Sequence, residues 1–273
     1  MPIIEANSID QYYEIDGEGS PLILIHGGFV DLHIWDSQIE HFSDRYQIIR
    51  YDLRGHGKTG PSKIAEYSIE LFADDLKALL DALGVEQAII CGISFGGMVA
   101  QAFAVKYKPI VHALVLSDTA VSVSLTLADK FQRYVLFPKW MMRLTIRLIG
   151  VKKFVDYSFW LAKATRSEEW FGKDKATREY VQERMLEIEE DEYVKIYDAI
   201  YDFHLLELQV IDAPTLVLNG EYESKSVFRH SEEILKLVMG SEMKIVPEAG
   251  HTSNMENPDG FNFLLQQFLD RSA

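Results

Sequence analysis

Short apolar runs alternate with longer helical patterns over most of this chain. The runs are rich in β-branched residues and end at turn formers, as buried strands do. They span residues 21–27, 46–52, 87–94, 111–118, 213–220 and 242–251. Apolar residues recur at helical spacing in segments 68–84, 96–107 and 260–272. This alternation predicts an α/β fold in which helices flank a mostly parallel sheet.

The alternation is interrupted between residues 121 and 208. No strand pattern occurs there, and four stretches have the spacing of helices: 139–150, 152–164, 176–190 and 191–208. We therefore predict that residues 121–208 form a helical cap, inserted after the strand that ends near Asp118. Residues 1–120 and 209–273 are then predicted to build the α/β core.

Composition narrows the class of protein. The 273 residues are 48% hydrophobic, which suffices for a full-sized core, and the formal net charge is −15. A surface this acidic repels phosphate backbones and anionic lipids, so we expect neither nucleic acid nor a membrane as a partner. The N-terminal segment lacks the basic and apolar regions of a signal peptide. These features favour a soluble, cytoplasmic protein.

The sequence gives no sign of redox or metal chemistry. The single cysteine, Cys91, excludes an internal disulfide and lies in a predicted strand, where an inert buried thiol is expected. No cluster of histidines, cysteines and carboxylates has the spacing of metal ligands, and no glycine motif for phosphate or dinucleotide binding occurs. We therefore expect no cofactor and no bound metal ion.

The most informative stretch is Gly92-Ile93-Ser94-Phe95-Gly96, where a predicted strand meets a predicted helix. In this setting a G-x-S-x-G sequence is typical of the nucleophile elbow, a sharp turn that exposes one serine hydroxyl at the carboxyl end of a sheet. The glycines two residues before and after Ser94 are needed because a Cβ at either position would meet the neighbouring strand or helix. Ser94 is therefore the candidate nucleophile.

Five segments in order resemble the α/β-hydrolase fold superfamily, particularly its capped serine hydrolases of the enol-lactonase and small carboxylesterase branch. They are LILIHGGF (22–29), YDLRGHGKT (51–59), CGISFGGMVAQAFAVKY (91–107), LVLNGEYE (216–223) and AGHTSNMENP (249–258). The resemblance covers nearly all of the predicted core but not the cap, which in this family helps to select the substrate. It implies the family's fold and a triad in the chain order serine, acid, histidine.

His251 is the candidate base, because it lies in the segment that resembles the family's histidine loop. His26 and His56 stand next to glycines, and we expect them to brace loops. The other five histidines lie in no motif and are expected to be structural: His33, His41, His112, His204 and His230.

The acid is where the sequence departs from the family pattern. Aspartate is usual three residues after the glycine that ends the strand, whereas this chain has Glu223 three residues after Gly220. Glutamate can also hold the histidine tautomer and stabilise the imidazolium. Asp118, at the end of a neighbouring strand, is the alternative acid, and its structural interpretation is a carboxylate that caps the following segment. We favour Glu223.

Two backbone amides are expected to form the oxyanion hole. Phe95 follows the nucleophile, and Gly28 lies in the loop after the first core strand. Four side chains are candidates for contact with the substrate: Phe29, Met98, Trp140 and Trp160.

Together these features predict a serine hydrolase that cleaves a carboxylic ester or lactone through an acyl-enzyme. The resemblance implies that an aspartate nucleophile would have indicated a dehalogenase or an epoxide hydrolase. Other reactions on the same triad stay open: C–C hydrolysis, acyl transfer, perhydrolysis and lyase chemistry. The alternative from a different class is a ligand-sensing signalling protein with slow or no turnover.

Overall fold

A computed structural model describes residues 2–165 and 175–272 of the chain. In these residues the centre is an eight-stranded sheet with the order β1-β2-β4-β3-β5-β6-β7-β8. The strands are β1 (Ile3–Ala6), β2 (Ile9–Asp16), β3 (Ser20–Ile25), β4 (Tyr46–Tyr51), β5 (Ala88–Ile93), β6 (Val111–Ser117), β7 (Thr215–Gly220) and β8 (Glu242–Val246). β2 is antiparallel to β1 and β4, and the other neighbours are parallel. The predicted mostly parallel sheet is confirmed.

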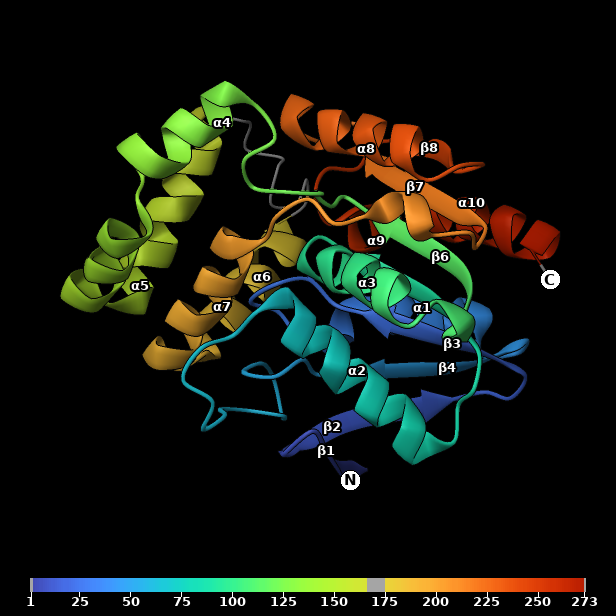
Figure 1. Ribbon diagram of the computed structural model, residues 1–273. Coiled ribbons are helices and arrows are strands. Elements are labelled where there is room, and N and C mark those ends of the chain that lie inside the picture. Colours follow the sequence, from blue (N-terminus) through green and yellow to red (C-terminus); the bar gives the residue numbers. More distant parts are fainter. Residues whose placement is uncertain (1, 166–174, 273) are drawn as a thin grey trace.

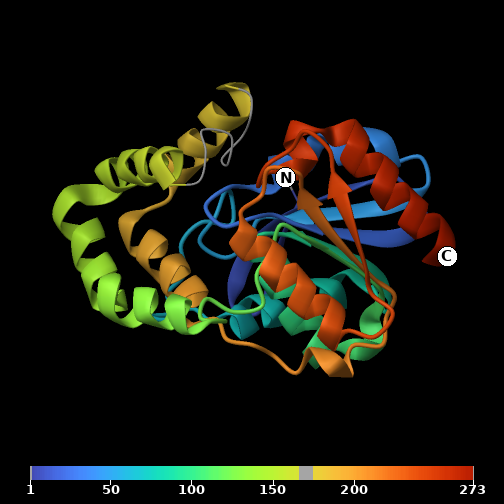
Figure 2. The same ribbon diagram turned by 90° about the horizontal axis from the view of Figure 1, so that it is seen from above.

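Helices cover both faces of the sheet, as Figures 1 and 2 show. On one face lie α2 (Ile69–Leu83), α3 (Phe95–Lys106) and α8 (Lys225–Leu237). On the other lie α1 (Asp36–Phe42) and α10 (Pro258–Ser272), with the short α9 (Ser253–Glu256) before it. The prediction that helices flank the sheet is thus confirmed.

The ends of α2 show how local sequence sets an element. The Ser68 hydroxyl accepts a hydrogen bond from the Leu71 N–H at the first turn, and Gly84 ends the helix with a φ of 71°. A serine N-cap and a left-handed glycine satisfy backbone groups that a helix leaves unpaired. The predicted boundaries, 68 and 84, coincide with these two capping residues.

The strand order reverses at β3, and this reversal positions the candidate site. β4 lies on one side of β3, whereas β5 lies on its other side. In open α/β sheets, ligands bind outside the carboxyl ends of the strands at such a switch point. The loop after β3 and the turn after β5 meet here, since a Cβ placed on Gly27 would lie 3.7 Å from the Ser94 Cβ.

Between β6 and β7 the described residues form helical segments. They are α4 (Leu127–Phe131), a π-helix (Gln132–Leu136), α5 (Lys139–Thr165), α6 (Lys175–Glu187), α7 (Glu190–Asp202) and a 3₁₀ turn (Leu208–Val210). Gly150, with a φ of 79°, interrupts α5 between the two helices predicted there. The helices α4 to α7 lie beside the carboxyl edge of the sheet (Figures 1 and 2). The division of the chain into core and cap remains a prediction, and residues 166–174 of that cap lie outside the described residues.

A buried ion pair anchors the loop after β4. The Arg54 guanidinium donates from two nitrogens to the Asp75 carboxylate on α2, one bond being 2.8 Å long, and both side chains are fully buried. Arg54 also donates to the Ser62 hydroxyl at 2.8 Å and to the Asn7 carbonyl at 3.0 Å. The same loop carries His56, so this pair holds one wall of the region around Ser94.

We expect Arg54→Met to lower the free energy of unfolding by about 3–5 kcal/mol, because Asp75 is then buried without its cationic partner. Urea denaturation of the parent and the variant measures the loss. Lys77→Met is the control, because the Lys77–Asp81 pair lies on the helix surface and should contribute less than about 1 kcal/mol. Equal losses in the two variants would contradict the anchoring role of Arg54.

Candidate active site

Ser94 lies in a strained turn between β5 and α3, with a φ of 53° and a ψ of −116°. A Cβ on Gly92 would lie 2.3 Å from the Gly96 carbonyl oxygen, and a Cβ on Gly96 would lie 2.3 Å from a carbonyl oxygen of β3. Both glycines are therefore required, as predicted. The Ser94 N–H donates to the Ser117 carbonyl at 2.8 Å, and the Thr119 hydroxyl donates to the Ser94 carbonyl at 2.6 Å. These bonds hold the strained conformation in place.

The structure brings Ser94, His251 and Glu223 together from the ends of β5, β8 and β7. Ser94 Oγ lies 2.8 Å from His251 Nε2. His251 Nδ1 forms a short hydrogen bond with Glu223 Oε2, and the other Glu223 oxygen accepts from the Ser224 N–H. The Glu223 side chain is fully buried, whereas the His251 side chain is 16% exposed. A hydrogen-bonded series thus runs from a buried carboxylate through an imidazole to a hydroxyl.

Asp118 directs its carboxylate elsewhere. Oδ1 accepts from the Gly220 N–H at 2.8 Å, and Oδ2 accepts from the hydroxyls of Ser117 and Ser253. Asp118 therefore ties the ends of β6 and β7 to the segment that follows β8. Burial, and then repulsion from the Glu223 charge, raise the pKa of Asp118 to about 7. These contacts describe a buried brace beside the series of Ser94, His251 and Glu223.

Gly28 lies against Phe95, the residue that follows Ser94. A Cβ on Gly28 would lie 3.3 Å from the Phe95 Cβ, so the two segments approach closely. The neighbouring Phe29 N–H is already engaged, because it donates to His56 Nε2 at 3.0 Å. In the described part of the chain, no backbone acceptor pairs with the amide of Gly28 or Phe95. Both amides can therefore meet an oxygen atom bound beside Ser94.

Two buried histidines brace the loop that carries Gly28. His26 Nε2 accepts from the Leu53 N–H at 3.0 Å, and His56 Nδ1 donates to the Arg54 carbonyl at 2.9 Å. Burial lowers the pKa of His26 and is the main reason that the pKa of His56 falls to about 3. Both rings stay neutral near pH 7 and keep these bonds, in agreement with the bracing role predicted for them.

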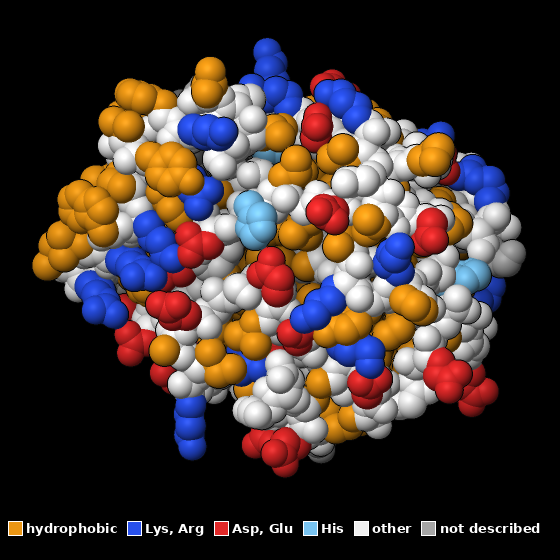
Figure 3. Space-filling view, viewed as in Figure 1, with side chains coloured by type: hydrophobic (Ala, Val, Ile, Leu, Met, Phe, Trp, Pro, Cys, Tyr) orange, Lys and Arg blue, Asp and Glu red, His pale blue; other side chains and the backbone are white. Residues whose placement is uncertain are grey.

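A cavity of about 720 Å³ opens over Ser94 and His251, and Met98 forms part of its wall. Phe29, Trp140 and Trp160 are not among the described residues that line it. Phe29 stacks on Tyr193 of α7 with 4.2 Å between the ring centroids. Trp140 and Trp160 are 66% and 62% exposed, and apolar side chains gather over α5 on the face seen in Figure 3. The structure thus brings Met98 to the candidate site but not the other three.

Several cavity residues lie in no motif of the sequence. Tyr197 and Tyr201 reach the cavity from α7, and His230 reaches it from α8. The four-residue spacing of Tyr193, Tyr197 and Tyr201 indicates one face of a helix, but it does not reveal what that face contacts. For His230 the sequence carries no such signal.

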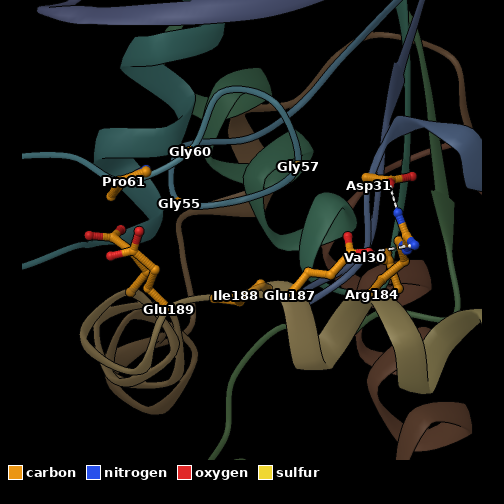
Figure 4. A pocket seen from close by; sticks show the side chains of 11 residues that line it. Val30, Asp31, Gly55, Gly57, Gly60, Pro61, Arg184, Glu187, Ile188 and Glu189 are labelled. Atoms are coloured by element: carbon orange, nitrogen blue, oxygen red, sulfur yellow. Dashed lines mark hydrogen bonds and ion pairs between the residues drawn. The ribbon is translucent and has the colours of Figure 1, made fainter.

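A smaller cavity, of about 160 Å³, lies between the loops after β3 and β4 and the junction of α6 and α7 (Figure 4). Asp31 stands at its edge and accepts from the Tyr180 hydroxyl at 2.6 Å and from Arg184 at 3.4 Å. Arg184 pairs with Glu187 at 2.7 Å as well. Since Asp31 follows Gly28 by three residues, these bonds join α6 to the loop beside Ser94.

The described residues show neither a metal centre nor a membrane span. No group of three or more histidines, cysteines and carboxylates among them is placed to hold a metal ion. None of their helices is both long and apolar enough to cross a bilayer. Cys91 is fully buried in β5, and burial raises the pKa of its thiol, as expected for an inert side chain.

Known proteins resemble this chain over most of its length. A family model described as alpha/beta hydrolase fold matches residues 20–258. The 3-oxoadipate enol-lactonase 2 of Acinetobacter baylyi is 26% identical over 248 residues, which cover 88% of this chain and 85% of that protein. The solved enol-lactonase of Burkholderia xenovorans LB400 is 25% identical with a TM-score of 0.83, covering 98% of this chain and 100% of that one. A malate-bound thermophilic esterase of Thermogutta terrifontis is 25% identical with a TM-score of 0.84, covering 99% and 98%.

The raised pKa of Asp118 predicts a stability component that falls as pH rises. The unfolded chain releases this proton near its ordinary pKa of about 4, whereas the folded protein keeps it up to about pH 7. The parent should therefore lose stability relative to Asp118→Asn between about pH 4 and 7, because asparagine cannot ionise. Urea denaturation across this range gives the difference, and the exposed Asp212→Asn provides the baseline. A difference that does not change with pH would contradict the prediction.

Proposed function

The chain belongs to the alpha/beta hydrolase fold family and is a hydrolase, and we propose that it cleaves a carboxylic ester or lactone through an acyl-enzyme on Ser94. The observation that carries the proposal is the hydrogen-bonded series Glu223–His251–Ser94, with Ser94 Oγ 2.8 Å from His251 Nε2. The similarity to an enol-lactonase and an esterase supports hydrolysis of an acyl bond. Serine at the elbow favours attack on a carbonyl carbon.

In the first half of the reaction, Ser94 Oγ bonds to the substrate's carbonyl carbon and gives its proton to His251 Nε2. The buried Glu223 carboxylate stabilises the imidazolium that forms. The carbonyl oxygen becomes an oxyanion, which the amides of Gly28 and Phe95 hold at the N-terminus of α3. The bond to the leaving oxygen then breaks, and this oxygen takes the proton from His251.

In the second half, water replaces the alcohol. His251 Nε2 takes one proton from the water, whose oxygen bonds to the acyl carbon. The second oxyanion collapses, the bond to Ser94 Oγ breaks, and the proton returns from His251 to Ser94. With a lactone, the alcohol released in the first half stays attached to the acyl group, so one hydroxy acid leaves the site.

We assign selection of the acyl and alcohol groups to the predicted cap. Phe137, Met142 and Phe154 from the segment between β6 and β7 line the cavity over Ser94, together with Tyr197 of α7. Largely apolar walls of this kind bury substrate carbon, and a few polar groups fix its orientation.

A fluorophosphonate probe is expected to form one covalent adduct, at Ser94, because the elbow and His251 activate this hydroxyl. Ser94→Ala should abolish both the adduct and the hydrolysis of p-nitrophenyl esters and lactones. Peptide mapping by mass spectrometry locates the adduct, and Ser241→Ala is the control that should keep both. An adduct on another serine, or hydrolysis that survives Ser94→Ala, would refute the assignment.

The two carboxylates should respond differently to loss of charge. Glu223→Gln should lower kcat/KM on the order of 10⁴-fold, as the equivalent aspartate change does in a serine protease triad, because the wrong histidine tautomer results. Glu223→Asp should recover part of this loss, since the charge stays. Asp118→Asn should cost about tenfold or less, because Asp118 braces strand ends. kcat/KM is measured at one pH for variants shown to be folded. A large loss of kcat/KM in Asp118→Asn together with almost no loss in Glu223→Gln would reverse the assignment.

A further inference from the structure

His230, on α8, lines the same cavity as Ser94 and His251 and is only 6% exposed. Its Nδ1 is enclosed and has no hydrogen-bond partner among the described residues. Burying a polar atom without a partner is unfavourable, and an apolar side chain of similar size would avoid this loss. The fold therefore gains no hydrogen bond from Nδ1 of His230. Any polar role of this ring depends on its other nitrogen, Nε2.

The burial of Nδ1 selects one form of the ring. A neutral imidazole carries its proton on one nitrogen only. A proton on Nδ1 would create an enclosed N–H without an acceptor, which is rare in proteins, whereas a proton on Nε2 can meet a molecule in the cavity. Burial lowers the pKa of His230, and attraction to Asp129 opposes this only in part. Near pH 7 the ring is therefore neutral and presents Nε2–H as a donor.

Other polar side chains of the cavity are already engaged. The hydroxyls of Thr145 and Ser158 donate to carbonyls one turn earlier in α5, at 2.8 Å each. Arg133 donates to the Ser124 hydroxyl at 3.3 Å and pairs with Asp202 at 3.6 Å, whereas its Nε has no partner among the described residues. Thr145 and Ser158 keep their partners within α5 and therefore contact a substrate mainly through carbon.

We propose that His230 is a specificity-determining residue whose Nε2–H donates a hydrogen bond to a neutral acceptor oxygen of the substrate, away from the scissile bond. The inference rests on the ester or lactone hydrolysis proposed above and narrows its substrate class. The substrate is an acyl ester or lactone that carries a second oxygen, such as a keto, ether or ester oxygen, on an otherwise apolar frame. The neutral ring offers a hydrogen-bond donor without a positive charge, so the acceptor that it fits is an uncharged oxygen.

Kinetics on matched substrates test the inference. The panel pairs p-nitrophenyl hexanoate with its oxo-substituted analogues of equal length. For the parent, kcat/KM on at least one oxo ester should exceed that on the hexanoate by about tenfold or more, which corresponds to the contribution of one buried hydrogen bond. His230→Phe should bring this ratio to within about twofold, whatever its effect on the absolute rates, and His230→Gln should keep part of the preference because its amide donates.

The exposed His204→Phe is the control and should leave the ratio unchanged, because its side chain lies on the surface. A parent without preference for any oxo ester, or a preference that survives His230→Phe, would overturn the role of His230.

A second readout does not depend on turnover. Nitrogen NMR of Ser94→Ala protein, with the His230 signals assigned by comparison with His230→Gln, should show a neutral ring protonated on Nε2 at pH 7. An oxo ester should shift these signals, and the hexanoate should not. A charged ring, or a proton on Nδ1, would overturn the donor role. A different outcome separates the two proposals. If the NMR result is as expected but the parent protein hydrolyses no ester or lactone, the proposed function is overturned and the binding role of His230 stands.

Discussion

The close approach of β3, β5 and α3 at Ser94 is the constraint on which the site depends. Carbonyl oxygens lie so near to Gly92 and Gly96 that no side chain fits at either position. This approach forces Ser94 into a strained conformation, exposes its hydroxyl and brings the Gly28 loop against the start of α3. The positions of the nucleophile and of both proposed oxyanion amides therefore follow from one packing requirement. His26 and His56, held neutral by burial, and the Arg54–Asp75 pair keep the surrounding loops fixed.

Two buried carboxylates lie near each other at the ends of β6 and β7, and their contacts separate their roles. Glu223 faces the His251 ring, whereas Asp118 accepts hydrogen bonds from a backbone amide and two hydroxyls. Burial and the nearby Glu223 charge together raise the pKa of Asp118. One carboxylate is thus suited to stabilise an imidazolium, and the other, whose ionisation the fold disfavours, to hold strand ends together.

The parts of the fold that the sequence predicts are those that local patterns determine. β5, Ser94 and α3 follow from a buried apolar run, a glycine-flanked turn and a helical pattern, and the Gly150 break in α5 separates two helices predicted there. β1 and β2 escaped prediction because β2, with the sequence IDQYYEID, mixes charged and apolar residues at the antiparallel side of the sheet. Cavity residues escaped for another reason. Helical periodicity shows that Trp140 and Trp160 lie on helices, but only tertiary packing decides whether each faces solvent or the cavity.

The acyl-enzyme itself gives the most direct test of the account. An aryl carbamate is suitable because its acyl-enzyme hydrolyses slowly, so the intermediate accumulates before water attacks. Mixing the protein with excess p-nitrophenyl carbamate should release about one equivalent of p-nitrophenol and then nearly stop. Mass spectrometry of the quenched protein should find the carbamoyl group on the peptide that contains Ser94. Sustained release without an adduct, or an adduct on another residue, would contradict a mechanism in which Glu223 and His251 activate Ser94.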